Sequence, residues 1–244
     1  MLLNKTEGKL KNRLAVITGA SRGIGAATAK LFAAQGAHVI LVARTLGGLE
    51  EIDDEIRYKG GVCTLVPMDL TDYNKIDEMG ATIFERFGKL DILIANAGLL
   101  GTIGPINHIE PHIWEQTFAV NVTANWRLIR SLDPLLRLSD AGRAIFLTSA
   151  AAQYHRAFWG LYATSKIALE MIVRTYAQEI LKTNVTANLF NPGRTRTKMR
   201  AQAYPGEDPN AIKSPEFAAK QLINLAQPNC NLNGEIITAD EPCN

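Results

Sequence analysis

Blocks of apolar residues with two different periodicities alternate along the chain. Seven short runs of mostly branched apolar residues predict β-strands, and they lie at residues 14–17, 38–43, 62–67, 91–95, 144–148, 185–190 and 235–239. Between these runs, apolar residues recur every three or four positions, which predicts helices such as those at residues 46–59, 71–87, 112–138 and 215–226. Strands that alternate with helices predict an α/β fold, with a doubly wound parallel sheet covered by helices on both faces and joined by right-handed crossovers.

The first predicted strand ends in a glycine-rich turn, residues 18–25, with the sequence Thr-Gly-Ala-Ser-Arg-Gly-Ile-Gly. Gly19, Gly23 and Gly25 allow a tight turn and a close approach of the backbone to a ligand, and the helix that follows favours a phosphate at its N-terminus. The spacing differs from G-x-G-x-x-G, and the absence of a following Lys-Ser/Thr pair excludes a P-loop. The turn therefore predicts a dinucleotide site, or else a tight turn without a ligand.

The end of the second predicted strand bears on which dinucleotide would bind. An acidic residue there would hold a ribose hydroxyl and repel a 2′-phosphate, but this chain has Ala43 followed by Arg44, and Arg22 lies in the glycine turn. Two guanidinium groups suit a phosphate. This pattern favours NADP(H) over NAD(H); alternatively, Arg44 only lines the exposed edge of the sheet.

Two further strand ends carry candidate ligand contacts, because ligands bind at the carboxyl edge of such a sheet. Asp69, before Leu70, could accept a hydrogen bond from an adenine amino group, and residues 96–98 (Asn-Ala-Gly) could form a wall beside a ribose. Either segment could instead be an ordinary turn. Asn121 stands in the middle of a predicted helix, where asparagine competes with the backbone for hydrogen bonds, so it either kinks the helix for a purpose or is a tolerated polar residue.

Tyr162 and Lys166 lie four residues apart in a helical run, so their side chains share one face of the helix. A nearby ammonium favours the ionised form of a phenol, whose pKa is otherwise about 10. The pair therefore predicts a device for proton transfer, or else a solvated helix face that happens to carry both residues. Ser149, at the end of the preceding strand, can meet the start of this helix.

The segment at residues 194–214 is rich in charged and turn-forming residues and predicts a substrate loop or lid. Together with residues 99–109 and 150–159 it would form a largely apolar substrate pocket. Arg194, Arg196 and Lys198 could meet an anionic substrate such as an acyl-carrier thioester, or they could be solvated loop charges.

The composition is that of a globular protein, with 47% hydrophobic residues, 20% charged residues and a formal net charge of +2. This balance argues against nucleic acid as a partner. No apolar run approaches the roughly 18 residues that span a membrane, and the start of the chain is too polar for a secretory signal, so we expect a cytoplasmic protein with one domain over residues 1–244. The cysteines, Cys63, Cys230 and Cys243, are odd in number and scattered along the chain, so they indicate neither disulfides nor a metal site.

Taken together, these motifs resemble the short-chain dehydrogenase/reductase family, and the resemblance covers nearly the whole chain. It implies a Rossmann-type, mostly parallel seven-stranded fold and an oxidoreductase that transfers a hydride between NADP(H) and a carbonyl or secondary alcohol, for example a 3-oxoacyl thioester or another ketone. The alternative is a non-catalytic NADP-binding sensor or scaffold. The residues that the resemblance assigns to the cofactor are Gly19, Ser21, Arg22, Gly23, Ile24, Gly25, Arg44, Asp69, Leu70, Asn96, Ala97, Gly98, Tyr162, Lys166, Pro192, Gly193, Thr195 and Thr197.

The same resemblance implies four catalytic residues. Tyr162 would exchange a proton with the substrate oxygen, Lys166 would lower the pKa of Tyr162 and bind the nicotinamide ribose, and Ser149 would hydrogen-bond the substrate. Asn121 would keep a water and the helix kink in place, so that protons pass from Lys166 towards solvent, while Thr197 would help to hold the carboxamide.

The chain departs from the family pattern at two places. Thr148 replaces the first of two serines that the family often has, and residues 240–243 replace a common glycine pair, which weakens inferences about assembly through the C-terminus. Relatives commonly pair their long helices, so we expect a homo-dimer or homo-tetramer through apolar groups that cannot all face the sheet. The proposed groups are Trp126, Ile129, Leu169, Ile172 and Tyr176. The alternative is that the segments at 99–111 and 194–214 cover them.

Overall fold

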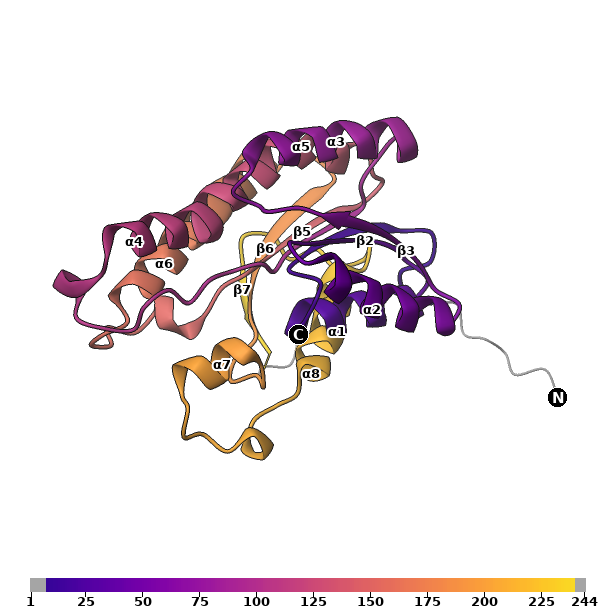
Figure 1. Ribbon diagram of the computed structural model, residues 1–244. Helices are drawn as coiled ribbons and strands as arrows, with labels where there is room; N and C mark the ends of the chain where they lie inside the picture. Colours follow the sequence, from indigo (N-terminus) through magenta and orange to yellow (C-terminus); the bar gives the residue numbers. More distant parts are fainter. Residues whose placement is uncertain (1–7, 240–244) are drawn as a thin grey trace.

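The computed structural model describes residues 8–239, within which seven strands form a single sheet in the order β3-β2-β1-β4-β5-β6-β7 (Figure 1). Every neighbouring pair is parallel. The strands are β1 (Leu14–Thr18), β2 (His38–Ala43), β3 (Val62–Pro67), β4 (Ile92–Ala95), β5 (Gly142–Leu147), β6 (Val185–Asn191) and β7 (Ile236–Thr238). The predicted doubly wound α/β sheet is therefore confirmed.

Helices cover both faces of the sheet (Figure 1). One layer contains α1 (Gly23–Ala34), α2 (Leu46–Tyr58) and α8 (Pro215–Ala226), and the other contains α3 (Tyr73–Phe87), α4 (Pro111–Phe118), α5 (Ala124–Arg137) and α6 (Gly160–Glu179). Because successive strand residues point to opposite faces, Val16 and Ile40 belong to the core under α3, α5 and α6, while Ile17 and Leu41 belong to the core under α1, α2 and α8. All five residues of β1 are buried for this reason.

The long helix predicted at residues 112–138 is continuous but not uniform. A wide π-turn, η2 (Ala119–Thr123), separates α4 from α5. Asn121 lies in this turn and is completely buried, so the structure supports the interpretation of Asn121 as the site of a helix irregularity. Such π-turns are frequent at functional sites.

The segment predicted as a loop at residues 194–214 is partly helical. It contains α7 (Lys198–Ala203) and the short 3₁₀-helix η4 (Pro209–Ala211), which together form a small lobe at one end of the carboxyl edge of the sheet (Figure 1). Thr197 caps α7, because its Oγ1 accepts a hydrogen bond from the backbone nitrogen of Arg200 at 3.1 Å. Two further 3₁₀-helices, η1 (Ile106–His108) and η3 (Ala150–Ala152), lie in the connections before α4 and α6.

Two of the apolar groups expected on an outer face belong to the core instead. Leu169 and Tyr176 are 1% and 6% exposed, and both pack under the sheet because they lie on the same side of α6 as Val173. Trp126 is 46% exposed, as expected, and the neighbouring α6 exposes Ile167 and Met171, which are 51% and 66% exposed.

No helix within residues 8–239 is long and apolar enough to cross a lipid bilayer. The expectations for the polar start of the chain and for residues 240–243 concern positions that lie partly or wholly outside the described residues.

Candidate active site

The glycine turn after β1 lies where the strand order reverses, between β1 and β4, which is the usual ligand position in such sheets. Gly19 and Gly23 have φ values of +66° and +58°, a conformation that favours glycine. A Cβ atom on Gly25 would lie 2.2 Å from the carbonyl oxygen of Gly19, and one on Gly19 would lie 2.8 Å from Nδ2 of Asn96. This turn therefore forms a close backbone cradle before α1 that fits the pyrophosphate of a dinucleotide.

Asn96 joins the end of β4 to the glycine turn. Its Nδ2 donates hydrogen bonds to the backbone oxygens of Thr18 and Gly19, at 2.8 and 3.2 Å. The Thr18 hydroxyl oxygen accepts in return from the backbone nitrogens of Asn96 and Ala97, both at 3.0 Å. Thr18 was absent from the predicted site residues, although its place directly before Gly19 at a strand end could have indicated this role. The structure thus brings Asn96 and Ala97 against the cradle, and the ribose contact expected of residues 96–98 stays a prediction.

The ends of β2 and β3 place Arg44 and Asp69 on the same side of the cradle. Arg22 and Arg44 are exposed. The pKa of Asp69 is lowered, mainly because its carboxylate accepts a backbone hydrogen bond from Thr71, and the charge of Arg44 contributes. Both Thr71 bonds, from the backbone nitrogen at 2.9 Å and from the hydroxyl at 2.8 Å, reach Oδ1 of Asp69. Leu70 is buried, so its side chain belongs to the core.

Tyr162 and Lys166 occupy one face of α6 against the end of β5, and both are buried, at 8% and 4% exposed. Nζ of Lys166 donates a hydrogen bond to the backbone oxygen of Leu147 at 2.8 Å and lies 5.7 Å from the centre of the Tyr162 ring. Burial lowers the pKa of Lys166 to about 8, and the charge of Glu170 opposes this change. The structure therefore brings the predicted proton-transfer pair to the carboxyl edge of the sheet.

The expected lowering of the Tyr162 pKa by Lys166 is not observed. Burial raises the pKa of Tyr162 to about 12, and a side-chain hydrogen bond with Ser149 offsets part of this increase. The physical reason is that the phenol is removed from water while the ammonium is directed to the Leu147 oxygen. Ser149 is correctly predicted to meet Tyr162; its Oγ also accepts from the backbone nitrogen of Ala151 at 3.2 Å.

Asn121 holds the segment after β4 against α6. Its Oδ1 accepts from the backbone nitrogen of Leu99 at 2.8 Å, and its Nδ2 donates to the Leu99 oxygen at 2.8 Å and to Oγ of Ser165 at 3.0 Å. The Ser165 hydroxyl in turn donates to the backbone oxygen of Tyr162 at 2.8 Å. Ser165 was not predicted as a site residue, although it directly precedes Lys166. The expected water at Asn121 stays a prediction.

The end of β6 closes the cradle from the other side. Gly193 has a φ of +64°, and the hydroxyl of the buried Thr195 donates to the backbone oxygen of Pro192 at 2.9 Å. A Cβ atom on Gly23 would lie 3.4 Å from Cγ2 of Thr197, so Thr197 borders the glycine turn. Of the predicted residues of this segment, Thr197 therefore meets the first turn.

Comparison with known proteins identifies this arrangement. A family model described as short chain dehydrogenase matches residues 13–208. The chain belongs to this family. The dehydrogenase is 36% identical over 209 residues to the uncharacterized oxidoreductase YciK of Escherichia coli strain K12, a match that covers 84% of this chain and 82% of that relative. It is 33% identical over 199 residues to the 2,3-dihydro-2,3-dihydroxybenzoate dehydrogenase of Bacillus subtilis strain 168, with coverage of 82% and 76%.

Solved structures agree with this assignment. A short chain dehydrogenase of Shigella flexneri 2a strain 301, complexed with NADP, has a TM-score of 0.93 and 33% identity, and the match covers 97% of this chain and 100% of that one. A short chain dehydrogenase of Escherichia coli CFT073, complexed with NADPH, has a TM-score of 0.91 with the same identity and coverage. The predicted family, Rossmann-type fold, oxidoreductase class and nicotinamide cofactor are confirmed.

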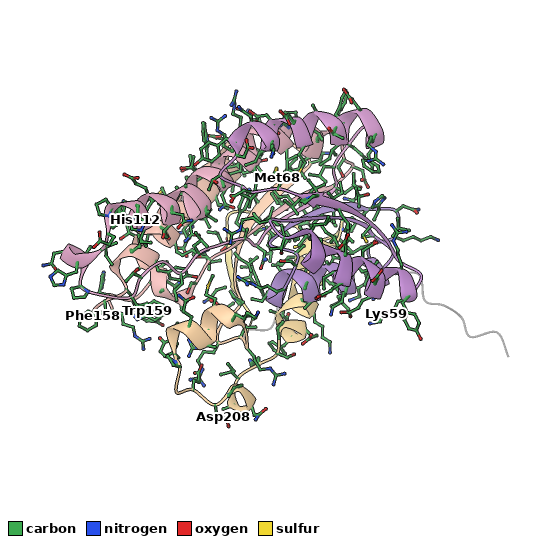
Figure 2. All side chains as sticks on the ribbon, in the orientation of Figure 1. Lys59, Met68, His112, Phe158, Trp159 and Asp208 are labelled. Carbon is green, nitrogen blue, oxygen red and sulfur yellow. The ribbon has the colours of Figure 1, made fainter. Side chains whose placement is uncertain are left out.

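In the dehydrogenase, an aromatic contact joins the lobe that carries α7 to the start of α6. The Trp159 ring lies 6.1 Å from the Tyr162 ring, nearly edge-on, and 5.6 Å from the Tyr204 ring. Arg156 hydrogen-bonds the Tyr204 hydroxyl. In Figure 2, Trp159 and Asp208 lie at the same end of the molecule. Both rings lie in segments predicted as pocket walls, at residues 150–159 and 194–214, but their contact was not predicted, because no sequence spacing relates Tyr204 to Trp159.

The lobe is also held by an internal ion pair. Nε and Nη2 of Arg200 donate to the two carboxylate oxygens of Glu207 at 2.5 and 2.6 Å, and the Arg200 guanidinium stacks 3.7 Å from the centre of the Tyr204 ring. Arg194, Arg196 and Lys198 are exposed, and Nη1 of Arg194 lies 3.9 Å from Glu207. Within the described residues, no cluster of three or more His, Cys, Asp or Glu side chains could hold a metal ion.

Proposed function

We propose that this dehydrogenase transfers a hydride between NADP(H) and the carbonyl group or secondary alcohol of a small molecule. The observation that carries the proposal is the position of Tyr162 and Lys166, which are both buried on one face of α6, with the ammonium 5.7 Å from the centre of the phenol ring, at the same sheet edge as the glycine cradle. The exposed Arg22 and Arg44, and the NADP and NADPH bound by two similar structures, support NADP(H) over NAD(H).

The cofactor residues divide by position. The backbone of the turn from Gly19 to Gly25 would hold the pyrophosphate, Arg22 and Arg44 would hold the 2′-phosphate, and Asp69 would meet the adenine. Residues 96–98 would border the ribose, and Thr197 would hold the carboxamide. The cofactor, when bound, supplies or accepts the hydride, and the protein positions and polarises the reacting groups.

The proton chemistry belongs to the chain itself. With a pKa near 12, Tyr162 is protonated at neutral pH and can donate its proton to the oxygen of a carbonyl that is being reduced. Ser149 would hydrogen-bond the same oxygen, and the positive charge of Lys166 would stabilise the negative charge that develops on the Tyr162 oxygen. Asn121 would keep Leu99 and α6 in register through its three side-chain hydrogen bonds.

A spectrophotometric assay of NADPH oxidation against a panel of carbonyl compounds tests this function. The panel should contain simple ketones, a 3-oxoacyl thioester, and, in the direction of NADP⁺ reduction, a cyclic dihydrodiol of the kind named for the Bacillus subtilis relative. We expect turnover with at least one compound. Tight NADPH binding by calorimetry without turnover of any compound would favour the sensor or scaffold alternative.

We also propose that the dehydrogenase forms a homo-oligomer through the outer face of α5 and α6. Trp126, Ile167 and Met171 expose apolar surface there, and contiguous apolar patches are often interfaces. A dimer needs only this face, whereas the C-terminal interface expected for a tetramer involves residues 240–243, which lie outside the described residues. The cytoplasmic location and the single-domain organisation stay predictions.

A further inference from the structure

Adjacent residues at the end of β5 contact adjacent turns of α6. The backbone oxygen of Leu147 accepts from Nζ of Lys166 at 2.8 Å. The hydroxyl of the next residue, Thr148, donates to Oε1 of Glu170 at 2.5 Å. Lys166 and Glu170 are four residues apart, so their side chains lie on the same face of the helix.

Ser149, the third residue in this row, contacts Tyr162, which lies one turn before Lys166. The helix face therefore presents a phenol, an ammonium and a carboxylate in succession, and the ammonium and the carboxylate are each hydrogen-bonded by one residue of the strand end. The phenol and the ammonium belong to the proposed reaction, whereas no step of that reaction uses the carboxylate of Glu170.

We propose that Glu170 is a positioning residue that acts through Lys166: its carboxylate, oriented by the Thr148 hydroxyl, keeps the buried ammonium charged beside Tyr162. The role in turnover rests on the proposed function. The effect on Lys166 is a property of the protein without substrate, so it can be measured separately.

The surroundings of Lys166 explain why a carboxylate is needed. Lys166 is 4% exposed, and burial disfavours a charged ammonium. On its own helix it faces Tyr162 and Glu170. The other elements around it present neutral groups: the Leu147 carbonyl of β5, the segment after β4, where a Cβ atom on Gly98 would lie 3.7 Å from Nζ, and the Asn121 amide of η2, whose Oδ1 would lie 3.3 Å from the same Cβ atom.

Thr148 gives the carboxylate a fixed place. The Thr148 side chain is 3% exposed, and its backbone nitrogen donates to the Phe190 oxygen of β6 at 2.9 Å, so the residue is anchored in the sheet. A β-branched side chain in such a position has few rotamers. The hydroxyl can therefore hold Glu170 in one position, in agreement with the effect of Glu170 on the pKa of Lys166, which opposes the lowering by burial.

The direct test is a pH titration of Lys166 by NMR in protein labelled with ¹³C at the lysine Cε atoms, with the Lys166 signal assigned by its loss in Lys166→Arg. Glu170→Gln removes the charge but keeps an oxygen that can accept from Thr148. We expect the Lys166 pKa to be lower by about one pH unit in this variant, as for the loss of a nearby opposite charge. Thr148→Val removes the hydroxyl and should lower the Lys166 pKa by less than Glu170→Gln does. Thr148→Ser keeps a hydroxyl and should leave the Lys166 pKa at its wild-type value.

Glu179→Gln is the matched control, because it removes one carboxylate from the exposed far end of the same helix. It should leave the Lys166 pKa unchanged. An unchanged Lys166 pKa in Glu170→Gln, or an equal change in Glu179→Gln, would overturn the proposal.

Turnover gives a second readout. With an active substrate, the pH above which turnover falls should move down by about one unit in Glu170→Gln, by the same charge effect, and stay in place in Glu179→Gln. If turnover falls at the same pH in Glu170→Gln as in wild type, the proposed role of Glu170 in turnover is rejected. If wild-type protein turns over no compound, the proposed function fails, while the NMR titration still decides whether Glu170 acts on Lys166.

Discussion

Asn121 holds Leu99 as a neighbouring β-strand would, because its side-chain amide both accepts from the Leu99 nitrogen and donates to the Leu99 oxygen at 2.8 Å. The π-turn of η2 places this amide towards the segment after β4, which borders the proposed cofactor site. One buried side chain thus links the long helix, the cofactor edge and, through Ser165, the helix of Tyr162.

We expect Asn121→Ala to destabilise the protein and to reduce turnover. The change leaves two backbone groups of Leu99 without their partners, and each unsatisfied buried group costs about 1–3 kcal/mol, so the free energy of unfolding should fall by about 2–6 kcal/mol. Urea unfolding measures this. Asn210→Ala, at an exposed position in η4, should change it by less than about 0.5 kcal/mol; equal effects of the two variants would contradict the linking role of Asn121.

Tyr162→Phe should abolish most turnover while NADPH still binds. The substitution removes only the phenol oxygen and its proton, and loss of positioned acid catalysis typically costs about 10²–10⁴ in rate. Steady-state kinetics and NADPH fluorescence titration measure the two effects. Tyr58→Phe, which is 91% exposed at the end of α2, is the control and should behave as wild type. Near-normal turnover in Tyr162→Phe would reject the proposed mechanism.

Arg44→Ala should weaken the binding of NADPH much more than that of NADH. A charge-assisted contact with the 2′-phosphate is worth about 1.5–3 kcal/mol, or about 10-fold to 100-fold in Kd. Calorimetry with both cofactors checks this, with Arg57→Ala on α2 as the control because Arg57 is paired with Asp53. An equal loss of affinity for both cofactors would show that Arg44 does not read the 2′-phosphate.

The stability of the protein should carry a pH dependence from Lys166. Its pKa in the folded protein, about 8, lies below the ordinary value of 10.5, so the unfolded chain binds more protons between these pH values. The free energy of unfolding should therefore contain a contribution that rises with pH across this window, on the order of 3 kcal/mol in total. Lys166→Met lacks this contribution.

Denaturant unfolding of wild-type protein and Lys166→Met at a series of pH values tests this effect. We expect Lys166→Met to gain less stability than wild type as the pH rises from about 8 to about 10.5. The raised pKa of Tyr162, about 12, makes the free energy of unfolding fall with pH, but only above pH 10, the ordinary pKa of tyrosine. Both proteins contain Tyr162. A difference in stability that stays constant with pH would contradict the burial effect on Lys166.

Ile167→Lys should convert the proposed oligomer into monomers. A charge on the exposed apolar face of α6 would be buried without a partner in an interface, which costs several kcal/mol. Light scattering should give a multiple of 26.7 kDa for wild type and a mass near 26.7 kDa for the variant. Tyr58→Lys, on the other helix layer, should keep the wild-type mass. A monomeric wild type would reject the oligomer.

The sequence by itself determined the alternation of strands and helices, the glycine cradle and the family of this protein. These features depend on local chemistry, since apolar periodicity and the conformational freedom of glycine act over a few residues. The spacing of Tyr162 and Lys166 likewise placed both on one helix face without knowledge of the fold.

The tertiary structure decided which groups surround these residues. Burial by several elements raised the pKa of Tyr162, although its helical neighbour is a lysine. Packing against the sheet turned Leu169 and Tyr176 inwards. Contacts between residues far apart in the chain, such as Trp159 with Tyr204 and Thr148 with Glu170, follow from no sequence spacing. Desolvation and side-chain contacts depend on the whole three-dimensional environment, which is why one sequence pattern could not determine them.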